Sequence, residues 1–152
     1  MDNKAIIKLP DTNAKTPIRV LVVDDNAILL RTVREMLCDR FTVSIAASSS
    51  QAFTSISKNI PDIILLDYEM PYENGEVILQ KLRNNAESKD IPVVFFTGSA
   101  DREVVTKLVS LNPAGYLLKP PNRQKMIDKI LKTLTPPETE SANDEEVKDN
   151  NT

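Results

Sequence analysis

The sequence contains no histidine and no tryptophan, only one cysteine, and only three glycines in 152 residues. Without histidine the chain cannot form a Ser-His-Asp or Cys-His catalytic group or a His-ligated metal site, and it cannot itself carry a phosphohistidine. Its chemistry must therefore use carboxylates, hydroxyls and amines. The single cysteine, Cys38, has no partner for an intrachain disulfide, which favours a reducing compartment, and we expect the cytoplasm.

Long apolar runs are also absent. No run approaches the roughly 20 residues that a membrane-spanning helix needs. Residues 1–17 lack the apolar core and cleavage site of a signal peptide, so we expect no membrane association. The glycines form no G-x-G-x-x-G motif, and no stripe of basic residues carries interleaved aromatic residues. We therefore expect neither a nucleotide nor a nucleic acid as ligand.

The net charge of −3 is unevenly distributed along the chain. Residues 136–152 contain six acidic residues and one lysine, a net charge of −5, which leaves +2 on the remaining 135 residues. This segment begins with two prolines and has almost no apolar residue to bury, so we expect an acidic disordered tail over 136–152. With a flexible leader over 1–17, the sequence predicts one folded domain over 18–135.

Short apolar segments alternate with amphipathic segments over this domain. Segments that are apolar throughout predict strands of a parallel sheet that is covered on both faces, and the segments between them predict the covering helices. We expect strands over 18–25, 41–47, 62–66, 91–99 and 114–121, and helices over 26–40, 48–60, 74–88, 100–112 and 122–134. Right-handed connections then give an α/β fold with a doubly wound, five-stranded parallel sheet and five helices.

Ligands of doubly wound sheets bind beyond the carboxyl ends of the strands, so the residues at the predicted strand ends are the candidate site. They are Asp24, Asp25, Asp67, Thr97 and Lys119. A pair of like charges about 4 Å apart costs roughly 4 kcal/mol at an effective dielectric constant of 20, so either a carboxyl pKa rises or a divalent cation binds. Oxygen ligands without His or Cys suit Mg²⁺, with Mn²⁺ as an alternative. With an amine and a hydroxyl beside them, these acids indicate phosphoryl transfer, in which an aspartate can be the nucleophile.

The sequence resembles a response-regulator receiver domain of two-component phosphorelay systems, of the stand-alone, chemotaxis-regulator-like kind, over roughly residues 18 to 135. Four motifs carry the resemblance: VVDDN at 22–26, LLDYEMPYENG at 65–75, FFTGS at 95–99 and GYLLKP at 115–120. Each motif alone is weak, but all four occur in order, with one motif at the end of each of four predicted strands. The resemblance implies a flavodoxin-like sheet with strand order 2-1-3-4-5.

The resemblance also implies a role for each acid at the strand ends. Asp67 is the expected phosphoacceptor. Asp25 would bind Mg²⁺ directly and Asp24 partly through water, with the main-chain carbonyl of Glu69 completing the protein ligands. The phosphoryl donor would be a histidine kinase or a histidine phosphotransfer protein, because this chain has no histidine of its own.

Three further residues are implied to transmit phosphorylation. Lys119 would pair with Asp67 and then with a phosphoryl oxygen, and the Lys119–Pro120 peptide bond is expected to be cis. Thr97 would turn to bind the phosphoryl group, and Tyr116 would rotate inward as the aromatic switch. The output surface would be the fourth helix, fifth strand and fifth helix, which present to an unknown protein target Val105, Val109, Tyr116, Arg123, Lys125, Lys129 and Lys132.

On this reading the chain is a phosphoacceptor signalling protein and not an enzyme, although it assists its own phosphotransfer and dephosphorylation. One alternative is a phosphohydrolase of the haloacid-dehalogenase type. In that family the nucleophile comes first in the chain and the acid pair last, which is the reverse of the order here. That family also uses a cap insertion to hold the substrate, and this sequence has none. Another alternative is a receiver-fold binding module that has lost phosphorylation. Such modules usually lose an acid or the lysine, and this chain retains all of them.

Overall fold

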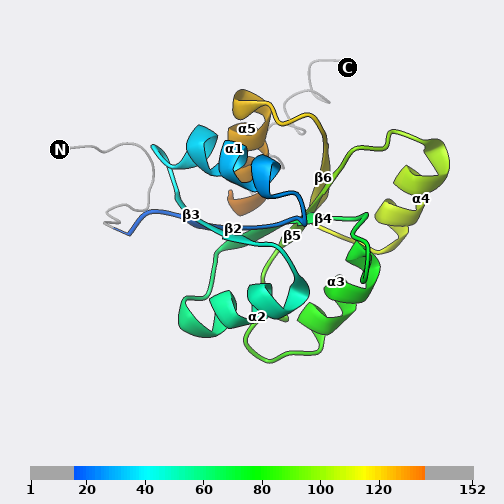
Figure 1. Ribbon diagram of the computed structural model, residues 1–152, viewed down its shortest axis with the longest axis horizontal. Helices are drawn as coiled ribbons and strands as arrows, with labels where there is room; N and C mark the ends of the chain where they lie inside the picture. The colour runs from blue at the N-terminus through cyan, green and yellow to red at the C-terminus, as the bar shows by residue number, and fades with distance from the viewer. Residues whose placement is uncertain (1–15, 136–152) are drawn as a thin grey trace, which may run out of the picture.

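The computed structural model describes residues 16–135. The predicted tail and all of the predicted leader except Thr16 and Pro17 lie outside these residues. The described chain alternates five strands with five helices. Figure 1 shows how they are arranged. In order they are β2 (Arg19–Val23), α1 (Ala27–Leu37), β3 (Thr42–Ala46), α2 (Ser49–Lys58), β4 (Ile63–Asp67), α3 (Gly75–Arg83), β5 (Val93–Thr97), α4 (Arg102–Ser110), β6 (Gly115–Leu118) and α5 (Arg123–Leu134).

The five strands form one parallel sheet in the order β3-β2-β4-β5-β6. Numbered along the chain this is 2-1-3-4-5, so the predicted flavodoxin-like topology is confirmed. Strand β2 lies between β3 and the central strand β4, with Val20 opposite Val43 on one side and Ile63 on the other. All strands point the same way, and their carboxyl ends therefore meet at one edge of the sheet.

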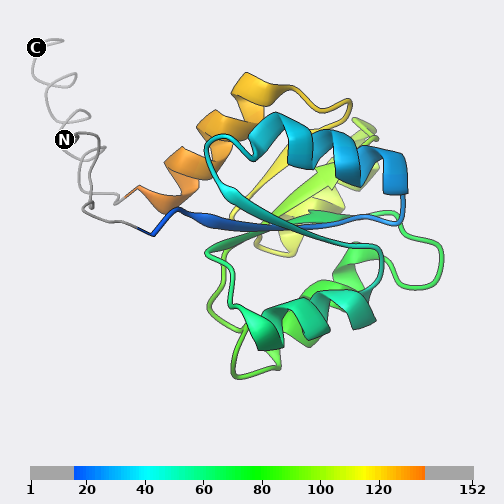
Figure 2. The same ribbon diagram turned by 60° about the vertical axis from the view of Figure 1, so that its left-hand side comes forward.

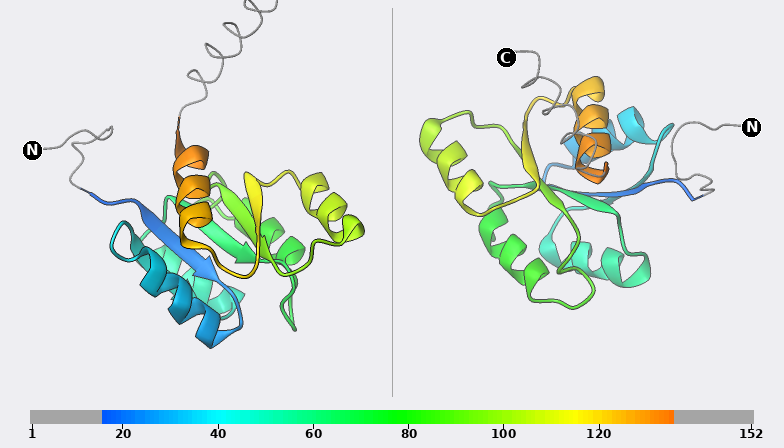
Figure 3. Two further views of the ribbon diagram at one scale, coloured as in Figure 1. Left: turned by 90° about the horizontal axis from the view of Figure 1, so that it is seen from above. Right: turned by 180° about the vertical axis from the view of Figure 1, so that it is seen from behind.

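Helices cover both faces of the sheet, which explains why the central strands are apolar throughout. Helices α1 and α5 pack together on one face, and α2, α3 and α4 lie on the other (Figures 1 and 2). Side chains of β2 alternate between the faces: Val20 and Val22 belong to the core under α1 and α5, and Leu21 and Val23 to the core under the other helices. Figure 3 shows the same three layers from above and from behind.

Each described helix begins after a polar residue whose side chain accepts a hydrogen bond from a backbone N–H of the first turn. Asn, Ser and Asp are all favoured at this N-cap position. The N-cap residues are Asn26, Ser48, Asn74, Asp101 and Asn122. The serines at the start of the second predicted helix therefore do cap it, through Ser48.

Most elements are shorter than predicted, whereas the third strand keeps its predicted length and is shifted by one residue, to Ile63–Asp67. The helix expected over 74–88 ends at Arg83. Asn85 then accepts a hydrogen bond from the N–H of Glu87 at 2.9 Å, and the buried Ser88 hydroxyl donates to the carbonyl of Leu82 at 2.7 Å. Polar side chains thus compete for backbone groups that a longer helix would have used. Likewise the strand expected over 18–25 ends at Val23, so the acid pair follows the strand.

Among residues 16–135, no helix combines the length and the apolar character that crossing a membrane would require.

Candidate functional site

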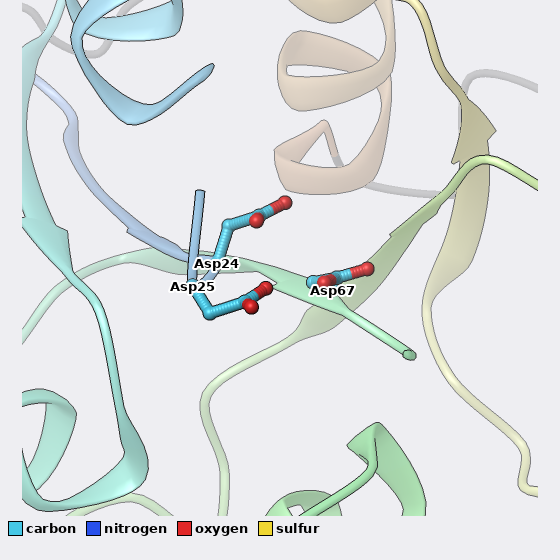
Figure 4. A group of neighbouring side chains, drawn as sticks. All are labelled: Asp24, Asp25 and Asp67. Carbon is cyan, nitrogen blue, oxygen red and sulfur yellow. The ribbon is translucent and has the colours of Figure 1, made fainter. Parts of the chain in front are cut away.

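Three carboxylates meet at the carboxyl edge of the sheet. Asp24 and Asp25 directly follow β2, and Asp67 is the last residue of the adjacent strand β4. One oxygen of each lies within 4.8 Å of the others. Figure 4 shows the three side chains next to one another. Asp24 and Asp67 are buried, with only 1% and 3% of their surface exposed, whereas Asp25 is exposed. The structure therefore brings together the three acids that the sequence placed at strand ends.

The two oxygens of Asp24 have different surroundings. Oδ1 accepts a hydrogen bond from the backbone N–H of Asn26 at 2.9 Å. Oδ2 is buried and accepts no well-directed hydrogen bond from the described residues, although Nζ of Lys119 lies 2.7 Å away as an ion pair. The Lys119 ammonium at 2.7 Å already neutralises this buried oxygen, so the position favours positive charge, which is also what a metal cation supplies.

Lys119 reaches the same group of acids from β6, just beyond the end of that strand. Its Nζ lies 3.3 Å from Oδ1 of Asp67 and 5.5 Å from the centroid of the Phe96 ring. Burial lowers the pKa of the Lys119 ammonium, but the contact with Asp24 and the charges of Asp67 and Asp24 outweigh burial and raise this pKa above its ordinary value. The Lys119–Pro120 peptide bond is cis, as the resemblance implied.

The carboxyl group of Asp67 has a strongly raised pKa. Burial, and then the negative charge of Asp24, raise this pKa from 3.8 to about 6. The charge and hydrogen bond of Lys119 oppose the shift, as does the N–H of Glu69, which donates to Oδ1 of Asp67 at 3.3 Å. Without a bound cation, Asp67 therefore stays protonated up to a higher pH than an exposed aspartate does.

Thr97 lies at the end of β5 and is completely buried. Its carbonyl accepts the backbone N–H of Lys119 at 2.8 Å, which ties the two strand ends together. Its hydroxyl oxygen accepts the N–H of Ser99 at 3.2 Å. The Ser99 hydroxyl accepts the N–H of Asp101 at 3.2 Å, and the Asp101 carboxylate accepts the N–H of Glu103 at 2.8 Å. A row of side-chain hydrogen bonds thus runs from Thr97 to the first turn of α4.

Tyr116 is half-buried on β6 and packs against the core under α2, α3 and α4. A hollow of about 390 Å³ lies beside it, between β6 and the first half of α5, and its lining includes Lys125 and Lys129. Both lysines belong to the surface predicted for output, as does Val109, which is 58% exposed. Arg123 is partly withdrawn from that surface, because its guanidinium binds the carbonyl of Met36 and the carboxylate of Asp39 beyond α1.

The loop Tyr68–Asn74 connects β4 to α3 beside the carboxylates. The Tyr68 ring lies edge-on to Phe95, with 5.8 Å between ring centroids, and its carbonyl accepts the N–H of Gly75 at 2.6 Å. A Cβ at Gly75 would come within 2.8 Å of both Phe95 and the Tyr68 Cα, so only glycine fits this close approach. The glycine of the LLDYEMPYENG motif therefore closes the loop against the core.

Sequence reasoning missed two sets of contacts near the site. One is the N–H of Asn26 on Asp24, and the other is the contact of Glu73 with Ser49 and Lys81. Ser49 and Glu73 are 24 residues apart and share no periodic pattern. The only sequence signal for the contact between Ser49 and Glu73 was the run of three serines at 48–50, of which one was needed for the helix cap.

Comparisons with known proteins agree with this geometry. The family model described as "Response regulator receiver domain" matches residues 20–131. The sensor histidine kinase TmoS of Ectopseudomonas mendocina is 30% identical over 113 residues, which are 74% of this chain and 12% of the kinase. The response regulator Rre1 of Synechocystis is 36% identical over 83 residues, which are 53% of this chain and 36% of that protein. The chain thus spans well under two thirds of these curated relatives.

Among solved structures, the chemotaxis protein CheY4 of Vibrio cholerae superimposes with a TM-score of 0.72 at 25% sequence identity, covering 78% of this chain and all of that one. The family model covers most of the described residues, including every strand-end acid, and the fold of the matched structure is the same doubly wound sheet. The chain therefore belongs to the response-regulator receiver family and contains a receiver domain of two-component signalling.

Proposed function

We propose that the receiver domain accepts a phosphoryl group on Asp67 from the phosphohistidine of a partner protein, in a reaction that depends on Mg²⁺. The observation that carries this proposal is the buried Asp67 carboxylate, which shares one edge of the sheet with Asp24, Asp25 and Lys119. A nucleophilic carboxylate, a cation site and a lysine in one place are what transfer of a phosphoryl group to a carboxylate requires.

The residues at the site fit a hard divalent cation. Asp24, Asp25 and Asp67 each offer one oxygen within a space of 4.8 Å, and Oδ2 of Asp24 is a buried oxygen without a directed hydrogen bond. With the main-chain carbonyl of Glu69, these oxygens would hold Mg²⁺, with Mn²⁺ as an alternative. When bound, the metal ion neutralises the charge on the oxygens of the transferring phosphoryl group.

In the proposed reaction, an ionised oxygen of Asp67 attacks the phosphorus atom of the phosphohistidine. A new O–P bond forms as the P–N bond breaks, and the imidazole nitrogen keeps the electron pair. Lys119 already contacts Asp67 at 3.3 Å, so its ammonium is placed to pair with a phosphoryl oxygen of the product. The Thr97 hydroxyl now accepts from Ser99 and has its own proton to donate to the phosphoryl group.

Phosphorylation would change the surface formed by α4, β6 and α5. Thr97 is linked through Ser99 and Asp101 to the first turn of α4, and Tyr116 is half-buried on the strand between the two helices. A phosphoryl group that binds Thr97 better in one arrangement shifts the population toward that arrangement. The target that reads this surface is a protein of unknown identity.

The phosphoryl donor would be a histidine kinase or a histidine phosphotransfer protein in the cytoplasm. Two of the curated relatives are histidine kinases, TmoS and the hybrid signal transduction histidine kinase D of Dictyostelium discoideum. In this proposal the domain is a signalling phosphoacceptor and not an enzyme. A phosphohydrolase of the haloacid-dehalogenase type gains no support, because within residues 16–135 the strands are joined by single helices and short loops without a cap insertion.

The test is incubation with Mg²⁺ and a small acyl phosphate, followed by mass measurement of the intact protein. We expect the wild-type chain to gain the mass of one phosphoryl group and Asp67→Asn to gain none. Peptide mapping after borohydride trapping should place the group on Asp67. A label retained in Asp67→Asn, or found mainly on a serine or threonine, would contradict the proposal.

A further inference from the structure

The loop Tyr68–Asn74 carries Glu69, whose N–H donates to Oδ1 of Asp67 at 3.3 Å. The position of this loop therefore sets a contact on the candidate phosphoacceptor itself. The loop projects beyond the carboxyl edge of the sheet in Figure 2, and its middle is open to solvent, with 98% of Tyr72 exposed. An exposed loop holds one conformation only if fixed points offset its conformational entropy.

One end of the loop is fixed by the core. Tyr68 packs edge-on against Phe95, and its carbonyl accepts the N–H of Gly75. The other end is fixed by the carboxylate of Glu73, which binds one residue in each of two helices. Oε1 of Glu73 accepts the hydroxyl of Ser49 in the first turn of α2, and Oε2 accepts Nζ of Lys81 in α3. Both oxygens are thus directed toward helices of the scaffold.

Glu73 combines an exposed ion pair with Lys81 and a hydrogen bond from Ser49. The hydrogen bonds from Lys81 and from Ser49 hold the pKa of the Glu73 carboxyl below its ordinary value, so this group is ionised at neutral pH. The Glu73 and Lys81 side chains are 27% and 49% exposed, and ion pairs with such exposure contribute little to global stability. What these contacts do determine is where the end of the loop lies relative to α2 and α3.

We propose that Glu73 is a positioning residue that holds the loop Tyr68–Asn74 beside the three carboxylates and thereby sets the affinity of this site for Mg²⁺. The metal site itself rests on the proposed function. Glu73 acts through the backbone of the loop and does not contact the metal ion. Residues that hydrogen-bond a metal ligand directly typically change metal affinity by about 10- to 100-fold when they are replaced. Because Glu73 acts one step further away, through the loop backbone, we expect an effect at the lower end of that range.

The chain offers a matched control for this proposal. Glu76 lies in the first turn of the same helix α3, is 25% exposed, and pairs with Lys107 at 3.3 Å. Replacing Glu76 removes one negative charge and one surface ion pair close to Glu73 without touching the loop contact. Glu76→Ala therefore separates loop positioning from the long-range effect of charge on Mg²⁺ binding.

The experiment is a calorimetric Mg²⁺ titration of the whole chain, without a phosphodonor, in wild type, Glu73→Ala, Ser49→Ala, the double variant and Glu76→Ala. We expect Glu73→Ala to weaken Mg²⁺ binding by roughly tenfold, Ser49→Ala to weaken it less, and Glu76→Ala to leave it close to wild type. The double variant should bind no more weakly than Glu73→Ala, because both changes remove the same contact. The thermal unfolding midpoint of the metal-free protein should stay unchanged throughout.

Equal affinities of wild type and Glu73→Ala would overturn the proposal. So would an equal loss in Glu76→Ala, or a loss that appears only together with a lowered unfolding midpoint. Because the titration uses Mg²⁺ alone, it is independent of phosphorylation. A wild-type chain that binds Mg²⁺ in a Glu73-dependent way but takes no label on Asp67 would contradict phosphotransfer and would support the role of Glu73.

Discussion

Nζ of Lys119 lies closer to Oδ2 of Asp24, at 2.7 Å, than to Oδ1 of Asp67, at 3.3 Å. The resemblance implied a pair between Lys119 and Asp67, and the structure shows the ammonium shared between the two buried acids. In the metal-free arrangement Lys119 thus supplies positive charge to a group of carboxylates that a cation would otherwise neutralise. Lys119 and a Mg²⁺ ion bound as proposed would therefore compete for the same carboxylate oxygens.

Removing the carboxylate of Asp25 should weaken Mg²⁺ binding more than removing that of Asp24 does. Asp25 is the exposed member of the group and has no described hydrogen bond or ion pair, so its oxygens are free to face a hydrated cation. Asp24→Ala should weaken binding less. The measurement is a Mg²⁺ titration of wild type, Asp25→Ala and Asp24→Ala, with the exposed and distant Asp90→Ala as control. Equal affinities of wild type and Asp25→Ala would remove Asp25 from the site.

Lys119→Ala should keep Mg²⁺ binding, with an affinity equal to that of wild type or higher, because a competing ammonium has left Asp24 and Asp67. The same variant should lose most of the conformational response to a phosphoryl mimic, since the ammonium just beyond β6 that would contact the phosphoryl oxygens is gone. Hydrogen exchange of the α4 and β6 backbone amides with and without the mimic measures this response. Lys89→Ala, which changes an exposed lysine outside the site, should respond as wild type does. A full response in Lys119→Ala would show that the signal bypasses this residue.

The stability of the metal-free domain should depend on pH through Asp67. The folded-state pKa of this carboxyl, about 6, is higher than the ordinary 3.8, so between these values the folded state binds more protons than the unfolded state. Stability then falls as pH rises from about 4 to about 6, and the ionised carboxylate costs roughly 2–3 kcal/mol at neutral pH.

Urea unfolding in the presence of a chelator tests this effect. At neutral pH, Asp67→Asn should be more stable than wild type by an amount of that order, and the difference should shrink toward zero near pH 4. Adding Mg²⁺ should stabilise wild type and have little effect on Asp67→Asn. A difference between the two proteins that does not change with pH would contradict the raised pKa.

Tyr116→Ala should abolish the gain or loss of partner binding that a phosphoryl mimic causes in pull-down experiments. Tyr116 is half-buried on β6 between the site and the exposed α4 surface, so truncating it disconnects the two. A chain that ends after Thr135 should keep the response. The opposite result, in which truncation removes the response and Tyr116→Ala keeps it, would place the output in residues 136–152.

The strand-end residues could be predicted from the sequence because a parallel sheet brings all carboxyl ends to one edge. Apolar runs followed by Asp24, Asp67, Thr97 and Lys119 therefore place these residues together without knowledge of any side-chain contact. Contacts within the site could not be predicted in the same way. That Lys119 leans toward Asp24, that Arg123 turns toward α1, and that Glu73 reaches Ser49 depend on side-chain directions across elements. Neither hydrophobic period nor spacing encodes these directions.

The row of hydrogen bonds from Thr97 through Ser99 and Asp101 to the start of α4 bears on the speed of the switch. Each bond joins a side-chain oxygen to the N–H two residues further on, and none of the three belongs to the hydrogen-bond ladder of the sheet. Turning Thr97 as proposed would release the N–H of Ser99, and because Thr97 is completely buried its packed neighbours would have to shift as well. Switching transitions that repack buried side chains take microseconds to seconds. Under the proposed function, the bond between Asp67 and phosphorus would set which signalling state is favoured, and the repacking around the buried Thr97 would limit how quickly the protein surface follows that bond.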